Sequence, residues 1–198
     1  ELHEWSIKNL ESFWESISEF YKILFDKPYE FILNRQIPFY KSKWFEGAKL
    51  SYVGHIIRHA KKNHTAIIYK NELNDIVEIS WNSLLEKVKE VRGWLIENNV
   101  KKGDVVVGYL LNHPDTIASF MAVNSLGAVW SCCSPDFGIE SIANRFEQLK
   151  PGILLAHKRY SYNGKDYIQE KKIKELQIKL PSIKKTIVFD STFDSWNL

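Results

Sequence analysis

From residue 105 onward, short apolar runs alternate with stretches of helical periodicity, and this alternation constrains the fold more than any other feature of the sequence. The runs are VVVGYL, AVWS, ILLA and TIVFD. A continuous run such as VVVGYL is typical of a strand that is buried on both faces of a sheet. Strands that alternate with helices form parallel βαβ units. We therefore expect an α/β fold, in which βαβ units form a mostly parallel, doubly wound sheet after a helical N-terminal arm.

The three-and-four spacing of apolar residues predicts a helix between each pair of these runs. The first helix would begin at Asp115, whose carboxylate can cap it, and would end at Gly127. The second would be capped by Ser134 or Asp136. The third would span about residues 166–180, where mixed charges indicate a solvated face.

The N-terminal part of the chain lacks this alternation. Apolar residues from Leu10 to Phe25 recur at helical spacing, and Pro28 would stop that helix. The aromatic segment 37–52, IPFYKSKWFEGAKLSY, has no period, so we expect a packed, irregular arm. Ser51 can cap a short helix that follows it.

Between the arm and the alternating region, TAIIYK and IVEIS flank the turn-forming residues NELND, which predicts a β-hairpin. Ser80 would then cap an amphipathic helix, and Asn98 or Asn99 would take the left-handed conformation at its end. We expect residues 1–62 to be a helical arm and residues 63–198 to be the first α/β subdomain of a larger domain.

Charge and cysteine content exclude several classes of protein. The net charge is only +3, from 27 basic and 24 acidic residues, which does not indicate a nucleic-acid partner. No apolar run is long enough to cross a membrane. The 2 cysteines are adjacent in the sequence, which excludes a disulfide scaffold and favours a reducing compartment such as the cytosol.

The metal-ligating and nucleophilic residue types occur in patterns that carry little chemistry. Cys132 and Cys133 alone cannot supply the four ligands of a structural zinc site, and small apolar residues at a strand end are the simpler interpretation. A nucleophilic thiol would need a lowered pKa. His55 and His59 have helical spacing but lack the glutamate of a zincin motif. His113 lies in a turn after a strand, where a ligand contact is an alternative to turn chemistry. We predict no metal site.

The segment WSCCSPDFG, Trp130–Gly138, is the strongest candidate for a ligand-binding loop. It follows a predicted strand and precedes a predicted helix, so it would lie at the carboxyl edge of the sheet, where ligands bind in this architecture. Pro135 would fix the turn, Phe137 could present an apolar ring, and Gly138 would allow close backbone approach. A structural turn is the alternative.

The sequence contains neither GxxxxGK[ST] nor GxGxxG. YNGKDY has one Gly-Lys pair, but a surface turn is the simpler interpretation. The fold pattern is therefore of a nucleotide-binding type, whereas the usual phosphate-binding loop is missing.

Several segments resemble one known group of enzymes. GDVVVGYLLNHPDTIASFMAVNSLGAVWSCCSPDFG, Gly103–Gly138, is similar to the N-terminal subdomain of the acyl-adenylating superfamily, which includes acyl-CoA synthetases, luciferases and nonribosomal adenylation domains. Within it, SCCSPDFG after LGAVW looks most like the acetoacetyl-CoA synthetases. Phe13-Trp14, Trp44–Tyr52 and Arg159–Tyr167 agree, so the resemblance covers nearly the whole chain.

The resemblance implies a parent enzyme that is an AMP-forming acid–thiol ligase of lipid and ketone-body metabolism. Acetoacetate and ATP would give an acyl-adenylate and pyrophosphate, and coenzyme A would then displace AMP, with Mg²⁺ as a further cofactor. The family's phosphate loop and its later catalytic residues have no counterpart in this sequence. We therefore expect an N-terminal fragment that is inactive alone, holds no tightly bound cofactor, has no catalytic residue and partners the remainder of its own chain.

The same resemblance implies a surface for coenzyme A. The related loop lies near the coenzyme A nucleotide, and a basic residue beyond the next strand approaches its phosphates. The candidate residues are Ser134, Asp136, Phe137, Gly138, Lys165 and Arg159. Ordinary surface charges are the alternative for Lys165 and Arg159, and helix capping for Asp136.

Two other functions remain open. The first is a fragment of another short-chain acyl-CoA synthetase, specific for acetate or propionate. The second is a noncatalytic α/β binding module that would be complete at about this length. The final residues TFDSWNL form no capped element, which favours the fragment over the module.

Overall fold

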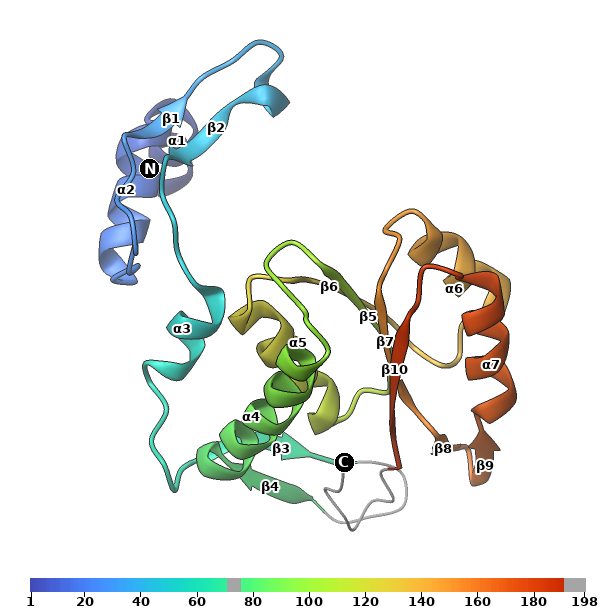
Figure 1. The fold of residues 1–198 in the computed structure, drawn as a ribbon. Helices are drawn as coiled ribbons and strands as arrows, with labels where there is room; N and C mark the ends of the chain where they lie inside the picture. Colours follow the sequence, from blue (N-terminus) through green and yellow to red (C-terminus); the bar gives the residue numbers. More distant parts are fainter. Residues whose placement is uncertain (71–75, 191–198) are drawn as a thin grey trace. The chain divides into compact units, whose positions relative to one another are not determined.

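A computed structural model describes residues 1–70 and 76–190. The turn of the predicted hairpin and the TFDSWNL end lie outside the described residues. The chain divides into two compact units, Glu1–His59 and Ala60–Leu198, and each is described by itself (Figure 1). No helix within the described ranges is both long enough and apolar enough to cross a membrane.

The first unit contains short helices and one pair of strands. Its elements are α1 (Leu2–Lys8), α2 (Leu10–Phe20), β1 (Phe31–Asn34), a 3-10 turn (Phe39–Lys41), β2 (Lys43–Glu46) and α3 (Tyr52–Ile57). β1 and β2 pair antiparallel, with Leu33 opposite Trp44. The expectation of an irregular aromatic arm is therefore wrong at β2, because cross-strand pairing orders a segment that has no clear period of its own.

The main helix of this unit ends earlier than Pro28, the predicted stop. Lys22 takes the left-handed conformation with φ of 50°. The N–H of Lys22 donates to the Glu19 carbonyl at 3.0 Å, and the N–H of Ile23 donates to the Ser18 carbonyl at 2.9 Å. This is a Schellman motif, which satisfies the last carbonyls of α2 without a glycine. Arg58 donates to the carbonyl of Tyr21 at 2.8 Å and holds this end from within the same unit.

The second unit contains the α/β sheet. Its elements are β3 (Thr65–Tyr69), β4 (Val77–Ser80), α4 (Trp81–Glu97), β5 (Val105–Tyr109), α5 (Pro114–Ser125), β6 (Val129–Cys133), α6 (Ile139–Glu147), β7 (Ile153–His157), β8 (Arg159–Tyr162), β9 (Lys165–Ile168), α7 (Glu170–Lys179) and β10 (Lys185–Phe189). β3 and β4 form the predicted antiparallel hairpin.

The central sheet has the strand order β10-β7-β5-β6 and is parallel throughout its described strands. α5 connects β5 to β6, whereas α6 returns the chain across β5 to β7. Right-handed crossovers in opposite directions place their helices on opposite faces. Figure 1 shows α4 and α5 on one face and α6 and α7 on the other. The predicted doubly wound sheet is confirmed, and its direction changes between β5 and β7.

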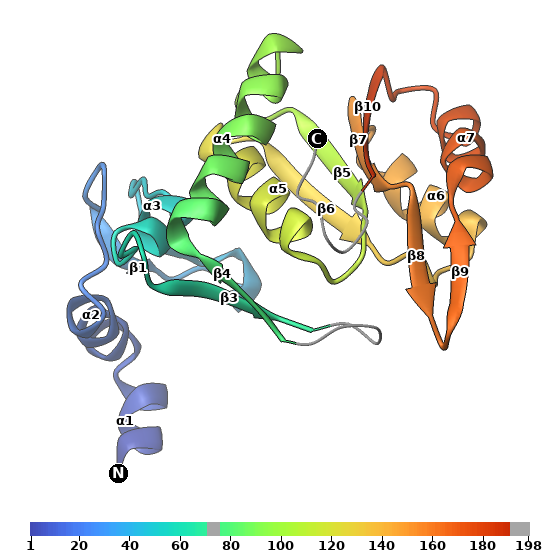
Figure 2. The ribbon, with the colours of Figure 1, turned by 90° about the horizontal axis from the view of Figure 1, so that it is seen from below.

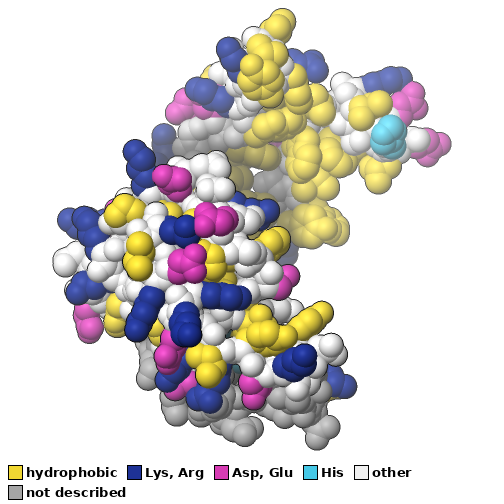
Figure 3. All heavy atoms as spheres, turned by 90° about the vertical axis from the view of Figure 1, so that its right-hand side faces the viewer, with side chains coloured by type: hydrophobic (Ala, Val, Ile, Leu, Met, Phe, Trp, Pro, Cys, Tyr) yellow, Lys and Arg dark blue, Asp and Glu magenta, His cyan; other side chains and the backbone are white. Residues whose placement is uncertain are grey.

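Buried apolar side chains cover both faces of the sheet, and one core cluster lies between the sheet and the α6–α7 face. Ile142 and Phe146 of α6 pack with Leu154 of β7 and Leu176 of α7, and all four side chains are essentially buried. Each contributes about 2 kcal/mol through removal of apolar surface from water. On the outer surface of this side, Lys and Arg alternate with acidic side chains (Figure 3), as predicted for the charged face of α7.

Gly108 has a specific role within β5. A Cβ at this position would lie 2.8 Å from the ring of Trp130. Cys132 of the neighbouring strand β6 is the register partner of Gly108. The glycine in VVVGYL therefore leaves room for the tryptophan that begins the candidate loop segment.

Several predicted helix ends are confirmed. The N–H of Gly54 donates to Ser51 Oγ at 3.1 Å, and the N–H of Ser83 donates to Ser80 Oγ at 3.2 Å. Asn99 has a φ of 60°, as expected of a left-handed residue that ends α4. Gly127, with a φ of 67°, follows α5.

Three predicted helix starts are wrong. α5 is capped by Nδ1 of His113 and not by Asp115. The residue at the cap of α6 is Gly138, and neither Ser134 nor Asp136 caps the helix, because the helix begins only at Ile139. α7 begins at Glu170, since residues 159–168 form the hairpin β8–β9 instead of the helix start.

Candidate functional site

The carboxyl edge of the sheet carries three neighbouring connections. They follow β5, β6 and β7, and the segment after β6 is the loop Ser134–Gly138. Strand β6 pairs in register with β5, so this loop lies at the edge expected from the sequence. Ligands in open α/β sheets bind outside the carboxyl ends of the strands, and most often where the direction of winding changes. This edge carries both a loop at a strand end, after β6, and the point where the winding direction changes, between β5 and β7.

The loop Ser134–Gly138 is open on its outer side. Phe137 is 41% exposed, and the Arg145 guanidinium of α6 lies 4.9 Å from the centre of its ring. Among the described residues, none lies within 4 Å of a Cβ placed at Gly138, so the backbone there leaves room for an approaching group. The N–H of Phe137 donates to the carbonyl of Ser134 at 3.3 Å, which makes the segment a turn.

The inner side of the loop rests on a buried tyrosine. The hydroxyl of Tyr109, at the end of β5, lies 3.3 Å from the carbonyl oxygen of Pro135 and 2.9 Å from Oε1 of Gln169. Burial raises the pKa of this phenol, so Tyr109 stays protonated and acts as a donor. The loop is therefore anchored from below while its outer side faces solvent.

The hairpin β8–β9 follows β7 and carries the two basic candidates. It projects as a narrow ribbon (Figure 2), and Asn163 and Gly164 at its tip both have positive φ, 51° and 68°, as a type I′ turn requires. The predicted surface turn at YNGKDY is thus observed. Lys165 is exposed at the tip and has no ion-pair partner within residues 1–70 and 76–190. Arg159 instead binds Asp190 at 2.9 Å, and this bond lowers the pKa of Asp190.

The six candidate residues are thus only partly brought together. Ser134, Asp136, Phe137 and Gly138 form one short loop. Asp136 is close enough to Tyr160 of the hairpin to raise the pKa of that phenol, although burial is the larger cause. The hairpin base therefore lies beside the loop, whereas Lys165 stands at the far tip and Arg159 is occupied by Asp190.

The two adjacent cysteines lie in different surroundings. Cys132 is exposed, and Cys133 is buried at the end of β6. Burial raises the pKa of the Cys133 thiol, with Arg145 opposing the shift. A raised pKa disfavours the reactive thiolate. Cys133 therefore fits the interpretation of a small residue packed at a strand end.

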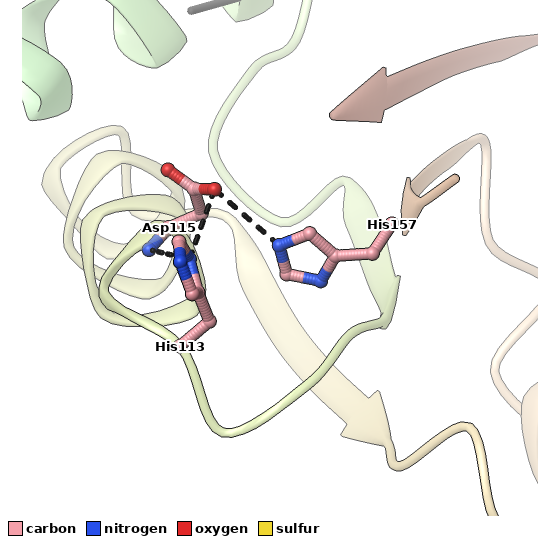
Figure 4. Close-up of side chains that lie close together, drawn as sticks. All are labelled: His113, Asp115 and His157. Carbon is pink, nitrogen blue, oxygen red and sulfur yellow. Dashed lines mark hydrogen bonds and ion pairs between the residues drawn. The ribbon is translucent and has the colours of Figure 1, made fainter. Parts of the chain in front are cut away.

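A second polar group lies at the point where the sheet changes direction. His157 is the last residue of β7, and His113 and Asp115 follow β5 (Figure 4). His157 Nε2 lies 3.3 Å from Asp115 Oδ2, and His113 Nδ1 lies 3.0 Å from the same oxygen. The side chains of Asp115 and His157 are 1% exposed. We call these three residues the His-Asp-His cluster.

Backbone N–H groups fix the protons of this cluster. The N–H of Leu111 donates to His157 Nδ1 at 3.1 Å. A neutral imidazole has one acceptor nitrogen and one N–H, so His157 carries its proton on Nε2 and donates it to Asp115. His113 Nδ1 accepts the N–H of Asp115 at 3.2 Å and thereby caps α5. Burial lowers the pKa of His157, which keeps the ring neutral.

Three ligand atoms that lie within 4.8 Å of one another could in principle hold a metal ion. Coordination by His157 Nε2 would require the ring proton on Nδ1, where it would face the N–H of Leu111. Lys87 also places an ammonium 4.0 Å from Asp115, which opposes a second cation. The His-Asp-His cluster therefore fits a network of hydrogen bonds better than a metal centre.

Sequence reasoning found only part of this cluster. His113 was a candidate for a ligand contact, whereas Asp115 was expected to be a cap and His157 was not singled out. His157 ends an apolar run, and nothing in that run distinguishes it from a strand residue. Only the pairing of β5 with β7 in the folded chain brings the three residues together.

Comparisons with known proteins agree with this architecture. The family described as AMP-binding enzyme matches residues 57–197, and the family described as acetyl-coenzyme A synthetase N-terminus matches residues 1–55. The acetoacetyl-CoA synthetase of Macaca fascicularis is 30% identical over 194 residues, which are 95% of this chain and 28% of that protein. The malonamoyl-CoA synthetase vrtB of Penicillium aethiopicum is 26% identical over 95% of this chain and 27% of its own length.

A solved structure of an acetoacetyl-CoA synthetase from Streptomyces lividans has a TM-score of 0.89 and 31% identity, and it covers 96% of this chain and 30% of that one. The present chain thus spans about 28% of the length of the macaque relative. Because the family match covers the whole doubly wound sheet and its flanking hairpins, the chain belongs to the AMP-binding enzyme family.

Proposed function

We propose that the protein that carries this chain is an acetoacetyl-CoA synthetase. The observation that carries the proposal is the likeness, over 95% of the chain, to relatives of that name, together with a TM-score of 0.89 to a structure of the same name. Acetoacetate and ATP would form an acyl-adenylate and pyrophosphate. The thiol of coenzyme A would then attack the acyl carbon and release AMP.

The chemistry explains why two steps are needed. A carboxylate is a poor acyl donor until one of its oxygens becomes a good leaving group, and AMP provides this. Charge that develops on the phosphoryl and acyl oxygens requires fixed cations, for which we propose Mg²⁺ with ATP. No residue of this chain is assigned to these steps. We also propose a cytosolic location, based on the 2 free cysteines, and a domain boundary near residue 62.

For this chain we propose a role on the coenzyme A side. The loop Ser134–Gly138 supports it, because Phe137 offers an exposed ring on which a base could stack and Gly138 has open space around it. Lys165 is the available cation for phosphates. Arg159 is the weaker of the two basic candidates, because its ion pair with Asp190 would have to break first.

The test measures AMP release by the gene product that carries this chain. With ATP and coenzyme A present, kcat/KM for acetoacetate is expected to exceed that for acetate by at least about tenfold, the discrimination that one well-placed substrate contact provides. Omission of coenzyme A should abolish turnover. The 198-residue chain alone is the matched control, and we expect it to give no ATP–pyrophosphate exchange.

A second candidate is a ligase for a different short acid. The Penicillium relative is named for malonamate, which shares with acetoacetate a carbonyl group β to the carboxylate, and the N-terminal family match is named for acetyl-coenzyme A synthetase. The same assay with malonamate, acetate and propionate decides between them. A preference for acetate or propionate would replace the acetoacetate proposal.

A further inference from the structure

A buried hydrogen-bond network lies under the Ser134–Gly138 loop and joins it to the start of α7. The Tyr109 hydroxyl faces two acceptors, the carbonyl of Pro135 and Oε1 of Gln169. A phenol has a single proton to donate. Gln169 is fully buried, and its Nε2 makes no hydrogen bond with residues 1–70 or 76–190.

The side chain of Gln169 links Tyr109 to the hairpin. Its Oε1 accepts the Tyr109 proton at 2.9 Å, and the carbonyl of Pro135 lies 3.3 Å from the same hydroxyl. Tyr160 of the hairpin lies close enough for the Gln169 amide to lower the pKa of its phenol, against the larger effect of burial. Loop, strand end and hairpin thus meet at one buried amide.

Gln169 also closes the base of the hairpin through its backbone. Its N–H donates to the carbonyl of Lys158 at 2.8 Å. Lys158 precedes β8 and Gln169 follows β9, so this bond joins the two ends of the hairpin that carries Lys165. The backbone of Gln169 thus holds the hairpin, while its side chain reaches the loop through Tyr109.

We propose that Gln169 and Tyr109 are positioning residues that hold the loop Ser134–Gly138 and the hairpin β8–β9 in one fixed arrangement and thereby set the affinity for coenzyme A. The proposal rests on the proposed function. Neither residue touches the reacting atoms, because both are buried beneath the surface that would receive the nucleotide. Adenylation, which precedes the arrival of the thiol, should therefore be independent of them.

The experiment compares Tyr109→Phe, Gln169→Leu and Gln169→Glu with wild type in the gene product that carries this chain. Loss of a hydrogen bond that orders the loop should raise KM for coenzyme A about three- to tenfold. The rate of ATP–pyrophosphate exchange should stay within about twofold. Gln169→Glu keeps the shape of the side chain but replaces the amide nitrogen with a second acceptor oxygen, so it should disturb the same buried network without a change in volume.

The matched control is Tyr167→Phe, which removes a hydroxyl from the same hairpin and keeps the ring that stacks on Tyr160 at 4.9 Å. It should leave KM for coenzyme A unchanged. Backbone hydrogen exchange of residues 134–138 supplies a second readout, and in Tyr109→Phe and both Gln169 variants it should become several-fold faster than in the control.

The outcomes separate the two proposals. Failure of the wild-type gene product to form any acyl-CoA would contradict the proposed function. Backbone hydrogen exchange of residues 134–138 would still test the arrangement of loop and hairpin. An equal loss of pyrophosphate exchange and of coenzyme A use would show a general structural role and overturn the positioning role. The positioning role would also be overturned if the Tyr109 and Gln169 variants had the same KM for coenzyme A as Tyr167→Phe. The same holds if their backbone hydrogen exchange at residues 134–138 were as slow as in Tyr167→Phe.

Discussion

The crevice between β5 and β7 and the loop after β6 lie on the same edge of one sheet, yet they are built in opposite ways. In the crevice, Asp115 and His157 are 1% exposed, and His157 Nε2 lies 3.3 Å from Asp115 Oδ2. In the loop, Phe137 is 41% exposed and its polar neighbours face solvent. The general rule for doubly wound sheets points to the crevice as the ligand site. Here the His-Asp-His cluster occupies it, so the open position is found one strand further along.

The comparison separates stability from binding. Residues of the crevice should govern the free energy of unfolding, because they are buried polar groups that depend on each other. Residues of the loop and of the hairpin tip should govern affinity and leave unfolding almost unchanged, because solvent already satisfies them.

Replacement of His157 is expected to have the largest effect. His157→Leu removes the acceptor of the half-buried Leu111 N–H and the donor to the buried carboxylate of Asp115. The free energy of unfolding should fall by about 3 kcal/mol, since each abandoned group costs roughly 1–3 kcal/mol. Urea denaturation of the chain measures it.

Two matched variants refine that result. His157→Gln can keep a donor toward Asp115, and His157→Asn can keep an acceptor for Leu111, so each should lose about half as much as His157→Leu. If His157→Leu lowered the free energy of unfolding by less than about 1 kcal/mol, the crevice would not govern stability. The contrast drawn between crevice and loop would then be wrong.

The pH dependence of unfolding should come next in size. The pKa of folded His157 lies below the ordinary value of 6.5, because burial and the nearby His113 disfavour the imidazolium more than Asp115 favours it. The unfolded chain therefore takes up this proton at a higher pH than the folded chain. The contribution to stability is complete above pH 6.5 and is lost as the pH falls through the folded pKa.

Thermal unfolding between about pH 7.5 and 5 tests this sign. Each unit by which the folded pKa is lowered adds about 1.4 kcal/mol of pH-dependent stability. Asp115, His113 and Lys87 face the same group, so His157→Gln is the control that isolates the His157 proton. An identical slope in wild type and His157→Gln would assign the pH dependence to another group.

The smallest effect is expected at the hairpin tip. Lys165→Glu should raise KM for coenzyme A about fivefold, because an exposed charge contributes at most about 1 kcal/mol. The free energy of unfolding should not change. High salt should reduce the difference in KM for coenzyme A between wild type and Lys165→Glu. Lys171→Glu, on the exposed face of α7, is the matched control, and an equal effect there would reduce Lys165 to part of the general surface charge.

The sequence predicted the sheet well because its strands carry their own signal. VVVGYL and ILLA became β5 and β7, whose residues are almost wholly buried. Ser51 and Ser80 were recognisable as helix caps for the same reason. A cap needs only the serine hydroxyl and the backbone N–H of the residue three positions later.

What the sequence did not reveal depends on pairing between distant segments. β2 is ordered by β1, and the start of α7 is displaced by the hairpin β8–β9. Asp115 was expected to cap α5, but burial turned its carboxylate toward His157 and left the cap to His113. None of these outcomes has a local signature, because each is decided by a neighbour that becomes adjacent only after folding.

The closed base of the hairpin β8–β9 has a practical consequence. The bond from Gln169 to Lys158 seals the ribbon where it leaves the body, and Asn163 and Gly164 complete the turn at the other end. Length and composition at the tip can therefore vary without a change in the strands behind it. A fluorescent label attached there would report the arrival of a nucleotide at the edge of the sheet while the interior of the protein stayed undisturbed.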